Sequence, residues 1–196
     1  MHNKILASTM AVGCCLMSSG AALALPAQEP LFLVPGVESQ VMINMSNDHQ
    51  LFYKAYDDWS DIDGDGEVDT TYKHDIDYYG YFDSYKCYDY SSGRFEPAST
   101  TADKYCAGNW SGNFLNWATM ARIDAVRKIL FGGLRSVDTS SDTVLERAFL
   151  PNDAHSFAKF YEGADVNKLT PFAPTGGLTI CNTTVSSDDT LVSEEV

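Results

Sequence analysis

The chain has 196 residues, 44% of them hydrophobic, and its 13 Lys and Arg against 27 Asp and Glu give a formal net charge of −14. This length suits one domain, or one domain with part of a second, and the apolar content excludes wholesale disorder. The acidic balance argues against nucleic acid as a partner, because phosphate binding needs a basic face. Cations and basic surfaces are the natural partners of such a charge.

Residues 1–24 have the pattern of a secretory signal. Lys4 supplies a short basic region, residues 5–23 are apolar or small, and Ala22-Leu23-Ala24 has the small-x-small form of a cleavage site. No other apolar run is long enough to cross a bilayer. We therefore expect an exported protein that keeps no membrane span after signal cleavage.

The next part of the chain divides into three stretches. Residues 25–40 form an extended N-terminal segment with three prolines, and residues 41–45 (VMINM) predict a short buried strand. Residues 47–112 read as a loop-rich insertion, because they hold ten of the eleven tyrosines and a dense run of acids. Two interpretations of the tyrosines stay open: a binding face, since Tyr gives large contact area at low entropy cost, or packing of a region poor in aliphatic residues.

The second half predicts helices and one strand. Residues 113–131 predict a helix, because Met120, Ile123, Val126 and Leu130 share one face. Gly132-Gly133 supplies its stop. Further helices are expected over residues 141–150, where Thr143 and Glu146 have capping-box spacing, and over residues 152–163. A strand is expected over residues 178–181. The tail, residues 186–196, has no closing element, which favours a chain cut from a longer protein.

Three cysteines remain after removal of the signal. In an oxidising compartment Cys87 and Cys106 are the expected disulfide, which would contribute about 3 kcal/mol by loop entropy. Cys181 is then free, or has a partner beyond Val196.

The strongest chemical motif is an acidic run of nine residues, Asp61-Ile-Asp63-Gly-Asp65-Gly66-Glu67-Val-Asp69. The acids at alternate positions direct their side-chain oxygens into one turn, which Gly66 permits. The Glu67 carbonyl supplies a further oxygen, and Asp69 binds the ion directly or through water. Tyr72 occupies the twelfth position, where an EF-hand loop has a bidentate Glu, so Asp75 or Asp77 is the expected replacement. The motif predicts calcium in preference to magnesium. The alternative is a solvated acidic turn.

Signs of catalysis are missing from the sequence. His49, His74 and His155 are isolated and lack zinc-site spacing. Ser111 does not lie in a nucleophile elbow, and there is no phosphate-binding glycine loop. We therefore predict that the protein is not an enzyme.

One long motif resembles a known family. The run Trp110-Ser-Gly-Asn-Phe-Leu-Asn-Trp117, followed by Arg122-Ile-Asp-Ala-Val-Arg-Lys128, resembles the N-terminal region of PilY/PilC-type proteins, the large surface factors of type IV pili. Similar stretches are Tyr79-Gly-Tyr-Phe-Asp83, Lys86-Cys87-Tyr88, Gly93-Arg94-Phe95, Asp142-Thr-Val-Leu-Glu-Arg-Ala148 and Pro151-Asn-Asp-Ala-His155.

The resemblance implies a partial von Willebrand factor A-like α/β (Rossmann-like) domain over residues 41–185, with residues 47–112 as a calcium-loop-bearing insertion. The adhesion site of such domains would fall on Asn44, Ser46 and Asp48, where only a weak, degenerate metal site is expected. It also implies a role in pilus biogenesis or surface adhesion, with minor pilins or a host-surface ligand as partners, at the cell surface, outer membrane or extracellular space. The alternative is a secreted, calcium-stabilised module that binds glycan or protein and is unrelated to pili.

Overall fold

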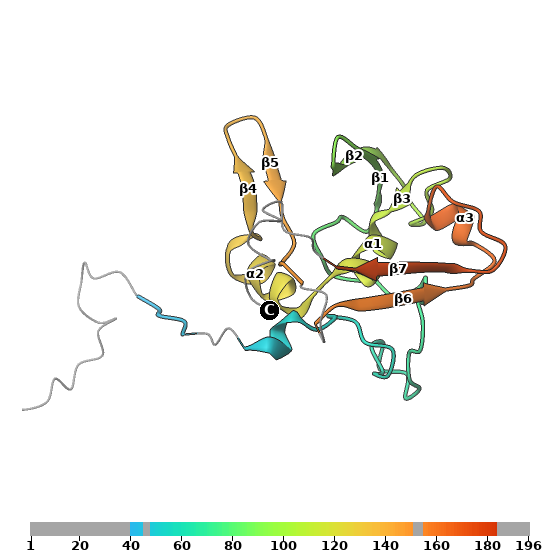
Figure 1. Cartoon of the computed structure of the whole chain (residues 1–196), viewed down its shortest axis with the longest axis horizontal. Coiled ribbons are helices and arrows are strands. Elements are labelled where there is room, and N and C mark those ends of the chain that lie inside the picture. Colours follow the sequence, from blue (N-terminus) through green and yellow to red (C-terminus); the bar gives the residue numbers. More distant parts are fainter. Residues whose placement is uncertain (1–39, 45–47, 151–154, 184–196) are drawn as a thin grey trace, which may run out of the picture. The chain divides into compact units, whose positions relative to one another are not determined.

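The computed structural model describes residues 40–44, 48–150 and 155–183 (Figure 1). The chain divides into two compact units, residues 1–45 and 46–196. The predicted signal (1–24), residues 25–39 and the tail (186–196) lie outside the described residues. Apart from residues 40–44, everything described below belongs to the second unit.

The described residues of that unit form a mixed α/β structure with three small antiparallel sheets. The first sheet has the order β2-β1-β3, and two hairpins, β4-β5 and β6-β7, form the others. The elements are η2 (His49–Phe52), β1 (Lys86–Ser91), β2 (Arg94–Thr100), β3 (Trp110–Ser111), α1 (Gly112–Thr119), α2 (Arg122–Phe131), β4 (Arg135–Asp138), β5 (Thr143–Leu145), β6 (Phe157–Tyr161), α3 (Val166–Leu169) and β7 (Leu178–Asn182). In Figure 1 the β4-β5 hairpin projects beyond α2. The coarse α/β prediction is confirmed.

The single helix predicted over residues 113–131 is wrong, because the chain forms two helices with a break at Met120 and Ala121. Both residues have extended backbone and pair with an earlier segment: the Ala55 amide donates to the Met120 carbonyl (2.8 Å), and the Arg122 amide donates to the Tyr53 carbonyl (3.0 Å). This tertiary pairing takes the hydrogen bonds that a continuous helix would have used. The predicted stop is confirmed, since Gly132 has φ 84°.

Helix α1 forms the centre of the core. Phe114 and Trp117 are buried and pack against Tyr72 and Tyr78, which come from the predicted insertion. The Asn113 side chain accepts a hydrogen bond from the Tyr78 amide (2.9 Å) and donates to the Tyr72 hydroxyl (3.0 Å). Tyr72 and Tyr78 are therefore part of the main core and are fixed to α1 by buried polar contacts.

The remaining secondary-structure predictions divide by outcome. The helix predicted over residues 141–150 is wrong, because β-branched Thr143 and Val144 lie in β5 and pair with β4 in a hairpin. At the turn of this hairpin, the Thr139 side chain accepts a hydrogen bond from the Asp142 amide (3.0 Å). The helix over residues 152–163 is also wrong in its described part, where aromatic-rich β6 pairs with β7. The strand over residues 178–181 is confirmed as β7.

The buried strand predicted over residues 41–45 is wrong for its described residues. Residues 40–44 have no regular structure, and Val41 and Met42 are 83% and 94% exposed. No strand among the described residues pairs with this segment, and an unpaired segment gains nothing from a strand conformation. Met45 lies outside the described residues.

The predicted disulfide is confirmed. Cys87 of β1 is bonded to Cys106, with 5.5 Å between their Cα atoms. The bond ties β1 to the loop that precedes β3. Cys181 in β7 is free and exposed.

Candidate metal centre and surface groove

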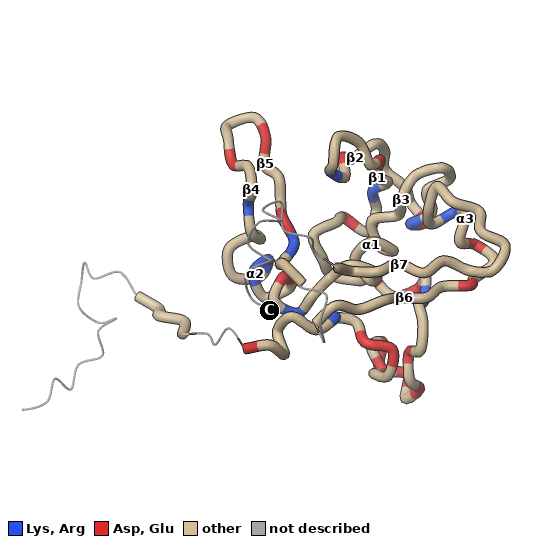
Figure 2. The backbone as a smooth tube through the Cα atoms, in the orientation of Figure 1, with Lys and Arg blue, Asp and Glu red and all other residues tan. Residues whose placement is uncertain are grey.

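The acidic loop folds around the side chain of Asp61. One Asp61 oxygen accepts hydrogen bonds from the amides of Gly64 (2.7 Å) and Asp65 (3.2 Å), and the other accepts from the Gly66 amide (2.9 Å). Gly64 and Gly66 have φ values of 78° and 91°, a region that favours glycine. Figure 2 shows acidic residues, coloured red along the backbone, gathered on this loop.

Three of the predicted ligands come together. Carboxylate oxygens of Asp61, Asp63 and Asp65 all lie within 4.8 Å of one another, a spacing that allows one ion to contact all three. All three residues are exposed. The Glu67 amide donates to Asp65 (2.8 Å), which keeps Glu67 in the same turn.

Asp69 closes the loop at its ninth residue. Its amide donates to the Ser60 carbonyl (2.9 Å), which forms an isolated antiparallel bridge across the base of the loop. Its side chain is fully buried, and one carboxylate oxygen accepts from the Ile62 amide (2.6 Å). The Asp69 carboxylate is thereby held at the start of the loop, although it is not among the three closest carboxylates.

The residue at the twelfth position lies in the hydrophobic core and not at the three-carboxylate group. Tyr72 is 4% exposed and packs in the core, and burial raises the pKa of its hydroxyl. The expected replacement ligands are not in the three-carboxylate group either. Asp77 is instead paired with Lys104 (2.9 Å), and that hydrogen bond lowers the pKa of its carboxyl.

A residue that the sequence reasoning missed lies at this loop. The Lys73 ammonium is 2.5 Å from Asp69, 3.2 Å from Asp63 and 3.3 Å from Asp65. The hydrogen bond that Lys73 donates to Asp69 is the largest influence raising the pKa of Lys73. The only signal in the sequence was its position four residues after Asp69.

Contacts within the loop lower the pKa of two of its acids. The pKa of Asp65 is lowered by the Glu67 amide and by Lys73. The pKa of Asp69 is lowered by Lys73 and by the Ile62 amide, which outweigh its burial. Both carboxylates are therefore charged at neutral pH.

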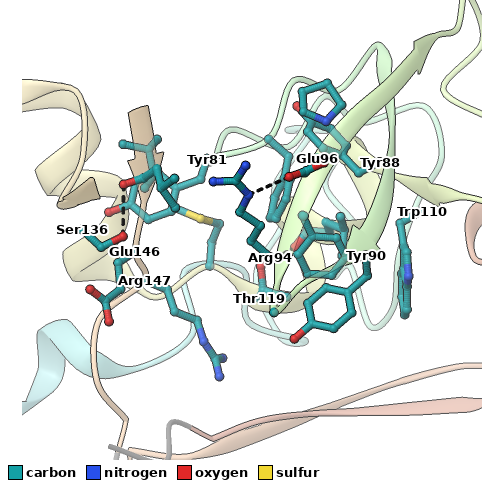
Figure 3. Close-up of a pocket in the computed structure, with 18 of the residues that line it drawn as sticks. Tyr81, Tyr88, Tyr90, Arg94, Glu96, Trp110, Thr119, Ser136, Glu146 and Arg147 are labelled. Carbon is teal, nitrogen blue, oxygen red and sulfur yellow. Dashed lines mark hydrogen bonds and ion pairs between the residues drawn. The ribbon is translucent and has the colours of Figure 1, made fainter. Parts of the chain in front are cut away.

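A second feature is a groove of about 1120 Å³ between the β1-β2 and β4-β5 hairpins. Figure 3 shows Tyr88, Tyr90 and Trp110 on one side and Glu146 and Arg147 on the other. A further lining residue, Arg94, is paired with Glu96 (2.7 Å) and with Asp142 (3.0 Å), so it connects the two hairpins.

The tyrosines divide between the two interpretations. Tyr72, Tyr78 and Tyr88 are buried and serve packing. Tyr79, Tyr85 and Tyr90 are 45%, 45% and 56% exposed and remain available at the surface. The buried tyrosines support the packing interpretation, and the exposed ones keep the binding-face interpretation open.

The other residues singled out in the sequence have structural contacts. Ser111 is buried and accepts a hydrogen bond from the Phe114 amide (3.4 Å) at the start of α1. His74 stacks on Tyr105 with ring centroids 3.9 Å apart. His155 lies in ring contact with His49.

The predicted adhesion-type site is only partly described. Asn44 is exposed, Ser46 lies outside the described residues, and the Asp48 side chain accepts a hydrogen bond from the Gln50 amide (3.1 Å) at the start of η2. That site stays a prediction. Within the described ranges, no helix is both long enough and apolar enough to cross a membrane.

Comparison with known proteins gives the family. The model of the PilY1 homolog small alpha/beta domain matches residues 69–196, most of the chain and all of α1 and α2. The chain belongs to this family. A type IV pilus biogenesis factor PilY1 homolog from Xylella fastidiosa is 45% identical over an alignment of 144 residues that covers 69% of this chain. A second PilY1 homolog from the same organism is 39% identical over an alignment of 92 residues that covers 41% of this chain.

The matches cover 10% and 8% of these two PilY1 homologs, so the chain corresponds to about a tenth of their length. No solved structure matches the chain. Neither the family description nor the names of the relatives indicate an enzyme.

Proposed function

We propose that the chain is an exported, non-enzymatic part of a type IV pilus biogenesis factor that acts in pilus assembly, surface adhesion or both. The observation that carries this proposal is the PilY1-homolog match over residues 69–196, together with 45% identity to a protein named as a pilus biogenesis factor. The confirmed disulfide supports export, because such bonds persist in oxidising compartments. The partners would be pilus components such as minor pilins, or a ligand on a host surface.

Fractionation and deletion test this role in the source bacterium. We expect the protein in sheared pili or in the outer-membrane fraction, and its consistent absence from both would contradict the proposal. Removing residues 48–183 in frame then separates the two roles. Loss of surface pili indicates assembly, whereas normal pili with reduced attachment indicate adhesion. Normal pili with normal attachment would count against both.

Calcium is the proposed ion of the acidic loop, with Asp61, Asp63, Asp65 and Asp69 as side-chain ligands and Glu67 through its carbonyl. The support is the three-carboxylate group and the bridge that brings buried Asp69 back to the loop base. The loop then closes at its ninth residue, which explains why Tyr72 is free to enter the core. The role of the ion would be to order the loop, not to catalyse.

Calorimetric calcium titration of the purified protein tests the site. We expect saturable binding that is lost in the Asp63→Ala/Asp65→Ala double variant, while circular dichroism shows that the variant is still folded. Absence of binding by the folded wild-type protein would remove calcium from the proposal and leave the pilus role standing. An Asp75→Ala variant is a suitable control, because it removes an acid that lies outside the three-carboxylate group.

We also propose that the chain contributes to a von Willebrand factor A-like domain. Helix α2 leaves Ile129, Leu130 and Phe131 between 41% and 69% exposed, the kind of apolar face that a central sheet covers in α/β folds. In a longer form of the protein these side chains should become protected from solvent. Hydrogen exchange that leaves α2 equally exposed in both forms would contradict this assignment.

The alternative function is that of a secreted module unrelated to pili. The groove and the exposed Tyr90 provide a surface for a glycan or peptide. The family match favours the pilus role, and a surface ligand bound in the groove is compatible with it.

A further inference from the structure

The acidic loop already holds a cation of the protein's own. The three hydrogen atoms of the Lys73 ammonium match three carboxylates, those of Asp63, Asp65 and Asp69, at 3.2, 3.3 and 2.5 Å. Among the described residues, the ammonium of Lys73 is the charge partner of Asp69 Oδ1, and this oxygen accepts no other hydrogen bond. A fully buried carboxylate oxygen is costly to leave without such a partner, so the loop is built to surround a positive charge.

We propose that Lys73 is a built-in competitor of calcium: its ammonium occupies the carboxylates in the calcium-free protein and leaves them when the ion binds. This inference rests on the calcium site of the proposed function and adds its regulation. Calcium needs six to eight oxygens at 2.3–2.6 Å. Carboxylate oxygens that point at the ammonium cannot be directed at the ion at the same time, so the two cations exclude each other.

The surroundings allow the lysine side chain to move while its backbone stays in place. The Lys73 amide donates to the buried hydroxyl of Tyr78 (3.1 Å), and its carbonyl accepts from the Ile76 amide (3.3 Å). Its side chain is 34% exposed, and so has a route into solvent. Displacement therefore costs the ion pairs of one flexible side chain and does not disturb the core around Tyr72.

Competition has two consequences for the loop. Without calcium, Lys73 offsets part of the repulsion among the acids and keeps Asp69 paired, so the loop stays folded. With calcium, part of the binding free energy is used to displace the ammonium, which weakens the apparent affinity. The site should then respond at higher calcium concentrations than the same loop without a lysine.

The decisive experiment compares calcium affinity in three proteins by calorimetry: wild type, Lys73→Met and Lys86→Met. Lys86 is a matched control, since it loses the same charge but is paired with Asp83 (3.5 Å). We expect Lys73→Met to bind calcium about tenfold more tightly than wild type does. Removing a unit positive charge close to a doubly charged ion changes the affinity for that ion by roughly tenfold in water. Lys86→Met should bind like wild type. Equal or weaker binding by Lys73→Met, with binding by wild type intact, would overturn the competition and leave the calcium site standing.

Chemical labelling tests the same point without a variant. Amine acetylation followed by mass spectrometry should modify Lys73 of the wild-type protein faster in calcium than in a chelator, whereas Lys86 should react equally in both. Unchanged or slower labelling of Lys73 in calcium-saturated protein would overturn the proposal. If no folded form binds calcium at all, the calcium site itself is refuted, and the competition with it.

Discussion

The ammonium nitrogen of Lys159 lies 2.6 Å from a carboxylate oxygen of Asp58, a residue 101 positions earlier in the chain. The Lys159 side chain is fully buried, donates to the Tyr56 carbonyl and lies 4.7 Å above the Trp117 ring. Burial lowers the pKa of Lys159, and the Asp58 hydrogen bond opposes that change. Burial would raise the pKa of Asp58, but hydrogen bonds from Lys159 and Lys54 lower it. The pair joins β6 to the segment that leads into the acidic loop.

Substitution of Asp58 by Asn should destabilise the protein by about 2 to 3 kcal/mol, because it leaves a buried ammonium without its charge partner. The value is at the low end for buried pairs, since the Asp58 side chain keeps 29% exposure. Urea unfolding at pH 7 measures the change. The same substitution at exposed Asp75 should cost less than about 0.5 kcal/mol. Equal losses at the two positions would show that the pair has no special role.

Asp124 should contribute to the free energy of unfolding with a pH dependence opposite in sign to that of the paired acids. Its buried carboxylate accepts hydrogen bonds from the Ala148 amide (2.8 Å) and the Tyr81 hydroxyl (3.1 Å), yet burial dominates and raises its pKa. When folding raises the pKa of an acid, the folded protein holds its proton more tightly than the unfolded chain does. The contribution of this acid to the free energy of unfolding is fully present below the pKa of the unfolded chain, about 3.9. It is lost as the pH rises through the pKa of the folded protein.

The variant Asp124→Asn removes this dependence and keeps an oxygen for Ala148. Its stability relative to wild type should therefore increase as pH is raised from 4 to 7, which urea unfolding at several pH values would show. A difference that decreases over this range would mean that hydrogen bonding outweighs burial at Asp124. Asp75→Asn is again the control, and its difference from wild type should stay within about 0.5 kcal/mol at each pH.

Loss of the Cys87–Cys106 bond should destabilise the protein by about 3 kcal/mol, since the bond closes a short loop in the unfolded chain. The double variant Cys87→Ala/Cys106→Ala, compared with wild type by thermal and urea unfolding, measures this. Cys181→Ala should unfold like wild type, because that thiol is exposed and free. A loss in the double variant no larger than that of Cys181→Ala would show that the bond adds little stability.

Features governed by neighbours in the chain were predictable from sequence. The glycine turn at Gly66, the helix stop at Gly132 and the pairing of Cys87 with Cys106 all follow from local chemistry or a small set of candidates. The strand at β7 was also found from a short apolar run.

Features decided by distant segments were not predictable. The break at Met120 carries no proline or glycine, and its cause is pairing with residues 53–55. Thr143 and Glu146 have the spacing of a capping box, but pairing with β4 decides that segment. Lys73 and Lys159 resemble ordinary solvated lysines in the sequence, and only the fold reveals their carboxylate partners.

The twelfth position of the acidic loop allows a test of where the loop closes. If the loop followed the EF-hand pattern, Tyr72→Glu would restore the missing bidentate ligand and tighten calcium binding. In the structure Tyr72 is buried, stacks on Tyr78 and accepts a hydrogen bond from Asn113. We therefore expect Tyr72→Glu to destabilise the protein by about 3 kcal/mol or more, because it places an unpaired carboxylate in the core.

Tyr72→Phe is the matched variant, because it keeps the ring and removes only the hydroxyl. It should cost about 1 to 2 kcal/mol through the lost Asn113 contact and leave calcium affinity unchanged. Urea unfolding and calcium titration of both variants, in calcium and in chelator, make the comparison. A folded Tyr72→Glu protein that binds calcium more tightly than wild type would contradict closure at Asp69, because the glutamate would then reach the ion from the twelfth position. Destabilisation by Glu with no gain in affinity, and a small loss with Phe, would show that the loop ends at its ninth residue and that Tyr72 serves the core.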